Sequence, residues 1–159
     1  MLKKLLTTTK LRYLFLTISS FLFLSVPCYG QHDYEIYYQS ETEETIQLTI
    51  VVYGVKEKYA NAYACSDAIY ALIFDGINGS KRRYLPYVND KETSYKDHYA
   101  YYHDLFENGG FWSFVIASSI VEKGKSKDKR KFFAVNVNIN ILALRASLVE
   151  HNVMRRFGV

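Results

Sequence analysis

The chain has 159 residues, enough for one domain with its own hydrophobic core and too few for two domains of ordinary size. It carries 20 Lys and Arg against 16 Asp and Glu, a formal net charge of +4. This excess comes from four residues near the N-terminus: Lys3, Lys4, Lys10 and Arg12. If residues 1–30 are removed after export, 20 − 4 leaves 16 basic residues against 16 acidic ones. The remaining chain is formally neutral, so its charge gives no reason to expect a nucleic acid as partner.

The N-terminus has the order of a secretory signal peptide. The basic residues precede an apolar run, Tyr13 to Val26, which is shorter than the roughly 20 residues that a helix needs to span a bilayer. The run is followed by Pro27-Cys28-Tyr29-Gly30, and we predict cleavage after Gly30. A lipid on Cys28 is the alternative, although Ser25 and Pro27 depart from the usual lipid-acceptor sequence. We therefore expect an exported protein of the periplasm or outer membrane, with no transmembrane span in the mature chain.

The mature chain begins with a polar segment and then a strand. Residues 31–44 are acidic and tyrosine-rich without a sustained period, which predicts an N-terminal tail and leaves 45–159 as one domain. Thr45–Tyr53 alternates between apolar and polar positions, which predicts a strand with one buried face.

A long helix is predicted next, from about Lys56 to Asp75, with Gly76 at its C-terminal end. It carries a stripe of small residues that would let its backbone approach a sheet closely: Ala60, Ala64, Ala68 and Ala71. Cys65 lies beside this stripe and is the only cysteine left once residues 1–30 are removed. We expect it to be a small buried side chain rather than a reactive thiol.

The segment from Asn78 to Lys91 is predicted to be a loop, followed by a shorter helix from Glu92 to Phe106. The aromatic residues of this helix recur at helical spacing, which predicts a buried face made of Tyr95, Tyr99, Tyr102 and Phe106.

The C-terminal third predicts a hairpin and a final helix. Phe111–Glu122 is predicted to be a strand, with Trp112, Phe114, Ile116 and Ile120 on one face. A turn over 123–130 would connect it to the strand Phe132–Asn140. Asn140 is then expected to cap a helix over Ile141–Glu150, which would end near Asn152. The expected fold class is α+β, a βαββα sandwich of about three antiparallel strands and two longer helices, with the short helix inserted.

With its residues in this order, the chain resembles a group of small exported envelope proteins of Gram-negative bacteria. The resemblance rests on Val52-Tyr53-Gly54 before the alanine-spaced helix, and on Asn136-Val137-Asn138 before Leu142 and Leu144-Arg145. More distantly, the chain is similar to the N-terminal domain of flagellar assembly protein T and to related outer-membrane lipoprotein domains. The resemblance implies an assembly or interaction module with an envelope protein as partner, no cofactor and no catalytic residues. The segment Tyr95 to Phe106 is extra relative to the flagellar domain.

Two classes of function follow from the remaining residues. His98, His103 and Asp104 are the best candidates for a metal site or a small hydrolase. On one helix, however, positions 98 and 103 differ by about 500° of rotation, so they lie roughly 140° apart and are poorly placed to share an ion. Gly124-Lys125-Ser126 lacks the first glycine of a phosphate-binding loop and lies in a hairpin turn, which excludes that motif.

The other class is a non-catalytic interaction module, with no catalytic residue and no metal ligand. Two of the 15 tyrosines lie in residues 1–30, so 13 remain after these are removed. Several of the 13 lie between Arg82 and Phe106. Tyrosine and arginine often anchor interfaces because they bury a large area and keep a polar group. The predicted binding residues are Arg82, Arg83, Tyr84, Tyr87, His98 and Tyr101. Whether this insertion binds a partner or only covers one end of the core stays open at this point.

Overall fold

The structure, a computed structural model, describes residues 33–79 and 85–155, so the predicted signal peptide and the predicted binding residues Arg82, Arg83 and Tyr84 lie outside the described residues. The described chain is α+β, with one antiparallel sheet in the order β1-β2-β4-β3. The strands are Tyr34–Glu41 (β1), Thr45–Tyr53 (β2), Val115–Lys125 (β3) and Lys131–Asn140 (β4). The helices are Glu57–Tyr70 (α2), Lys91–Asp97 (α3), Tyr99–Phe106 (α4) and Ile141–Glu150 (α5).

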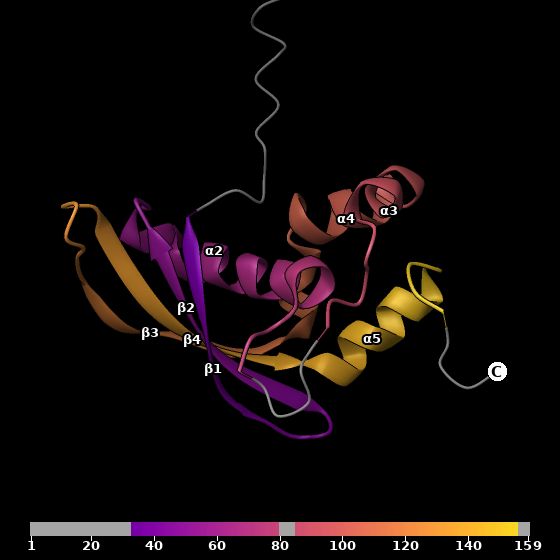
Figure 1. The fold of residues 1–159 in the computed structure, drawn as a ribbon, viewed down its shortest axis with the longest axis horizontal. Coiled ribbons are helices and arrows are strands. Elements are labelled where there is room, and N and C mark those ends of the chain that lie inside the picture. The colour runs from indigo at the N-terminus through magenta and orange to yellow at the C-terminus, as the bar shows by residue number, and fades with distance from the viewer. Residues whose placement is uncertain (1–32, 80–84, 156–159) are drawn as a thin grey trace, which may run out of the picture.

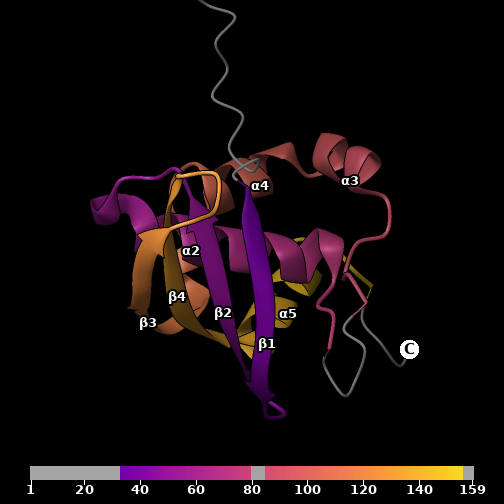
Figure 2. The same ribbon diagram turned by 60° about the vertical axis from the view of Figure 1, so that its left-hand side comes forward.

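The sheet has one face against the helices and one face without them. Figure 1 shows the sheet curving around α2, and Figure 2 shows α2 and α5 behind the strands. The buried side chains of β2 and β4 alternate as the sequence predicted: Ile46, Leu48, Ile50, Val52, Phe133, Val135, Val137 and Ile139. The core therefore lies between this face and α2, which contacts β2, β4 and β3.

Helix α2 buries the predicted small residues, because Ala60, Ala64, Ala68 and Ala71 are each 0% exposed. The predicted helix over 56–75 is confirmed in position, but its last turn, Ala71–Asp75, is π-helical. Gly76 ends it with φ 75°, the left-handed region that glycine reaches without strain. The small stripe thus brings the backbone of α2 close to the sheet.

A fourth strand corrects the prediction of an N-terminal tail over 31–44. β1 pairs with β2 in antiparallel register, from Tyr34 opposite Val52 to Glu41 opposite Ile46. Its half-buried residues Tyr34, Ile36 and Tyr38 pack against the core. The segment is ordered because this edge of the sheet adds three apolar side chains to the core.

The strand predicted over Phe111–Glu122 begins later and has different faces. Gly110–Phe114 forms a 3-10 helix, and β3 starts only at Val115. The register with β4 shifts around Ile116 and again around Val121, and both of these side chains are 54% exposed. Each β-bulge changes which face the following residues occupy, so simple alternation gave the wrong faces. The turn back into β4 lies within the predicted span but is shorter, because β3 continues to Lys125.

The predicted helix Glu92–Phe106 is two helices, because His98 breaks it. His98 has φ −121° and ψ 32°, and it ends α3 and precedes α4. The break changes the buried face: Tyr102, Leu105 and Phe106 of α4 are buried, whereas Tyr99 is 64% exposed. Tyr101, one of the predicted binding residues, is half-buried with its hydroxyl 3.2 Å from Ser147 Oγ.

The C-terminal helix follows the prediction. Asn140 caps α5, with its Oδ1 accepting a hydrogen bond of 2.8 Å from the Ala143 backbone N–H. Asn152 adopts φ 58°, just beyond the end of the helix. The polar caps and the switch from strand to helix at Asn140 were therefore all readable from the sequence.

Candidate functional site

The open face of the sheet is the face that no helix covers in Figure 2. Its side chains lie in four rows that cross the strands. Strand register sets each row, running from β1 through β2 and β4 to β3. The amide row is Ser40, Gln47, Asn138 and Ala117, with Gln39 beside it at the bulge of β1, and the hydroxyl row is Tyr37, Thr49, Asn136 and Ser119. The carboxylate row is Glu35, Val51, Ala134 and Glu122, and the aromatic row is Tyr53 and Phe132 beside Gly124.

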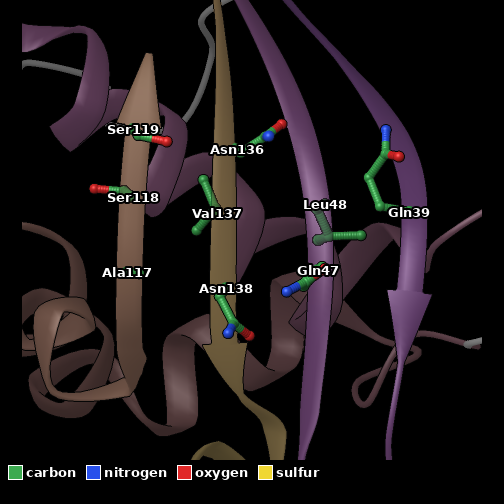
Figure 3. Close-up of a pocket in the computed structure, with 9 residues that line it drawn as sticks. All are labelled: Gln39, Gln47, Leu48, Ala117, Ser118, Ser119, Asn136, Val137 and Asn138. Carbon is green, nitrogen blue, oxygen red and sulfur yellow. The ribbon is translucent and has the colours of Figure 1, made fainter. Parts of the chain in front are cut away.

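The first two rows form a hollow of about 310 Å³. Figure 3 shows its lining residues, which come from all four strands. A chain of hydrogen bonds fixes several side chains: Gln39 Nε2 donates to Thr49 Oγ1 at 3.0 Å, and Thr49 Oγ1 donates to Asn136 Oδ1 at 2.7 Å. This geometry leaves the Asn136 amide N–H groups available at the surface, because its oxygen is the atom that is engaged.

Asn138 is the most informative residue of this hollow. Its Oδ1 is buried and accepts no hydrogen bond from the described residues. An unpaired buried acceptor costs roughly 1–3 kcal/mol, so such an atom is often explained by a ligand or a bound water. The hollow therefore offers both donors and acceptors, and none of its lining residues is ionisable.

The third and fourth rows border a larger and shallower hollow of about 800 Å³. Its floor includes Val51, Ala134 and Phe132. Glu35 accepts hydrogen bonds from the hydroxyls of Tyr37, at 2.5 Å, and Tyr53, at 2.9 Å, and these bonds lower the pKa of its carboxyl. The carboxylate is thus held ionised and in a fixed place by two aromatic side chains.

Arg130 closes one end of this second hollow. Its guanidinium lies 5.2 Å from the centre of the Tyr53 ring and pairs with Asp33 and Asp128. These hydrogen bonds raise the pKa of Arg130 and, with Ser126, lower that of Asp128. Since all of these groups are exposed, the pairs orient the side chains more than they stabilise the fold.

The predicted binding residues of the insertion are only partly brought together. Tyr87 and His98 line one hollow of about 380 Å³ between the start of α3 and the residues after α5. Asp90 and Arg155 also line it. Tyr101 does not line this hollow. Burial raises the pKa of its hydroxyl, and its ring lies 4.6 Å from that of His151.

The metal or hydrolase alternative finds no support in the described residues. His98 lines the hollow just described, whereas His103 and Asp104 are exposed and lie outside it. Asp104 accepts a hydrogen bond from Asn108, and the His103 ring packs against Tyr99. Among residues 33–79 and 85–155, no group of three or more His, Cys, Asp and Glu side chains is placed to hold a metal ion.

Two buried groups of α2 belong to the core. Cys65 is 0% exposed, and burial raises the pKa of its thiol to about 11, so the predicted buried cysteine is confirmed. Asp67 is 2% exposed, and burial raises the pKa of its carboxyl to about 7. In the part of the chain that the structure describes, Asp67 is the only buried charged residue, and its Oδ2 has no hydrogen-bond partner.

Sequence reasoning did not single out the open face as a site. The signal was present in the outward positions of β2 and β4, where Gln47, Thr49, Asn136 and Asn138 alternate with buried residues. Within each strand, these positions indicate only a face that is not part of the core. That they meet opposite each other depends on the pairing of β2 with β4, which the alternation does not specify.

The fold and this face define an α+β domain with one open, polar sheet face. A scan against protein-family models, a search of curated proteins and a search of solved structures found no match to the chain. The resemblance to envelope proteins and to flagellar assembly protein T therefore stays an expectation. No helix of the described residues is long and apolar enough to cross a membrane.

Proposed function

We propose that the protein acts after export as a non-catalytic binding module, and that the open face of the sheet is its binding surface. The observation that carries this proposal is the unpaired, buried Oδ1 of Asn138 in a hollow built by all four strands. Core packing accounts for the opposite face of the same strands but gives no reason for this arrangement. The side chains are also held in place, by the bonds through Thr49, so they can bind a ligand at low entropic cost.

The insertion between Arg82 and Phe106 offers a second surface. Its hollow brings Tyr87 and His98 together, but much of its aromatic content lies in the core, since Tyr102 is 0% exposed and stacks on Tyr95 at 4.5 Å. The insertion therefore contributes to the core, and the open face is the stronger candidate for binding.

Export is tested by sequencing the N-terminus of the protein isolated from its cells, which should begin at Gln31. Binding is tested by placing a photo-cross-linking amino acid at one position at a time in the full chain, in living cells. Gln47 and Ser119 report on the open face, His98 reports on the insertion, and Glu150, exposed on α5, is the control.

We expect discrete adducts from Gln47 and Ser119, to a protein or to a polymer, and none from Glu150. Adducts from His98 alone would assign binding to the insertion and overturn the assignment to the open face. The absence of adducts from every position, with the protein folded and exported, would contradict a binding role.

A further inference from the structure

The amide and hydroxyl rows on the open face present hydrogen-bonding groups of one particular kind. Gln39, Gln47, Asn136 and Asn138 are primary amides, and each can donate and accept at the same time. Ser119 adds a hydroxyl with the same property. A ligand that matches these rows must itself carry many groups that both donate and accept, and it must be uncharged where it contacts them.

Main-chain peptide recognition fits this surface poorly. An extended peptide binds a sheet by pairing with the unpaired N–H and C=O groups of an edge strand. The hollow is centred on β2 and β4, which are the two inner strands and are paired on both sides. Recognition at this face must therefore come from side chains.

The neighbouring rows add flat apolar surface and charged side chains. Tyr37 is 50% exposed, and Tyr53 and Phe132 pack against each other with ring centroids 6.3 Å apart at the far end of the face. Glu35 and Glu122 lie at the two ends of the carboxylate row. Lys127, Asp128 and Arg130 border the same hollow, so its charges are of both signs. The preference for an uncharged ligand therefore rests on the amide and hydroxyl rows, whose hollow has no ionisable lining residue.

The length of the surface suits a chain molecule. The amide row and the aromatic row are six residues apart along β2, from Gln47 to Tyr53, which corresponds to about 20 Å at the rise of a β-strand. A molecule lying along the strands would meet amides and hydroxyls first, then a small apolar floor, and then aromatic rings.

We propose that the open face binds an uncharged oligosaccharide chain that lies along β2 and β4. Sugar hydroxyls both donate and accept, as the amide rows require, and the C–H faces of sugar rings stack on aromatic side chains such as Tyr37 and Tyr53. The Asn136 amide donates to one sugar hydroxyl, and rotation of the Asn138 amide brings its buried, unpaired Oδ1 to the hollow, where it accepts from a second one. This inference rests on the proposed function and specifies its ligand.

The test uses the mature protein and an array of neutral and acidic oligosaccharides, followed by calorimetry with the best neutral binder. We expect binding to neutral oligosaccharides and none to acidic ones. Asn138→Ala and Asn136→Ala should each lower the association constant about tenfold, equivalent to about 1.4 kcal/mol. Asn78→Ala, at an exposed asparagine outside the sheet, is the matched control and should change nothing.

A second pair of variants separates stacking from hydrogen bonding and from misfolding. Tyr53→Phe keeps the ring and should retain most of the affinity, whereas Tyr53→Ala should lose it, with circular dichroism confirming that both variants fold. Binding to no neutral oligosaccharide, a preference for acidic ones, or affinity unchanged in both asparagine variants would overturn the inference. If cross-linking at Gln47 captures a protein while the array shows no binding, the proposed function stands and the oligosaccharide inference fails.

Discussion

Replacing Asp67 by asparagine should make the protein more stable at pH 7 and above and leave it almost unchanged at pH 4 and below. Asp67 lies on α2 with 2% exposure and an unpaired carboxylate oxygen. Burial raises the pKa of this carboxyl from 3.8 to about 7 in the folded protein. The folded state therefore keeps its proton over a pH range in which the unfolded state has released it.

The sign and size follow from proton linkage. Below about pH 4 the carboxyl is protonated in both states, and it costs no pH-dependent stability. Between about pH 4 and pH 7 only the folded state binds the proton, so the free energy of unfolding falls by about 1.4 kcal/mol per pH unit. Across this range the loss is about 4 kcal/mol, a large share of the roughly 5–15 kcal/mol that stabilises a typical domain. The amide of an asparagine cannot ionise, so the variant should not show this loss.

Urea unfolding at pH 4, 6 and 8 measures the effect. Asp67→Asn should match the unmodified protein at pH 4 and exceed its free energy of unfolding by about 4 kcal/mol at pH 8. Asp97→Asn, at an exposed carboxylate of α3, is the control and should differ by less than about 0.5 kcal/mol at each pH. A difference between Asp67→Asn and the unmodified protein that is the same at pH 4 and pH 8 would refute the assignment of a buried, protonated carboxyl.

Three further predictions concern the packing and capping of helices. Ala64→Leu should overpack the contact of α2 with the sheet and lower the free energy of unfolding by about 1–3 kcal/mol, measured by thermal unfolding. Ala146→Leu, at an exposed position of α5, is the control and should cost little. Equal melting temperatures for the two variants would place Ala64 at the surface. Asn140→Ala should lower the free energy of unfolding in urea by about 1 kcal/mol, because it removes the cap on the Ala143 N–H. Asn140→Asp keeps a capping oxygen and should retain most of this stability. Equal stability of the two variants would show that the cap does not stabilise the helix. Cys65 should react slowly with a thiol reagent in the native protein and rapidly in urea, because burial raises the pKa of its thiol to about 11.

The strands that were predicted correctly are those with one fully buried face. In β2 and β4 every inward residue is apolar, so a period of two is clear in the sequence. In β1 tyrosine occurs on both faces, as Tyr38 points inward and Tyr37 outward, and this hides the period. In β3 the bulges around Ile116 and Val121 interrupt the alternation. Edge strands are less constrained by the core, and their patterns are correspondingly weaker.

The candidate site was harder to predict than the fold. Its residues were readable one strand at a time as outward polar positions, but the hollow exists only because Thr49 lies opposite Asn136 and Gln47 opposite Asn138. These pairs join segments far apart in the sequence. The tyrosines of the insertion indicated an interface through their number alone. Tyr102, predicted to lie on the buried face of its helix, is in the core, whereas Tyr99, predicted on the same face, is exposed.

The pairing of β2 with β4 also determines when the chain can fold. Thr45 lies opposite Asn140, a separation of 140 − 45 = 95 residues, and β2 is an inner strand that needs β4 on one side. A chain growing from its N-terminus can form β1 with β2 and the first turns of α2, but their apolar faces lack half of the sheet until β4 has been made. Topologies rich in such distant contacts fold slowly. The native sheet therefore forms only after nearly the whole chain is available, which keeps the nascent chain unfolded for longer.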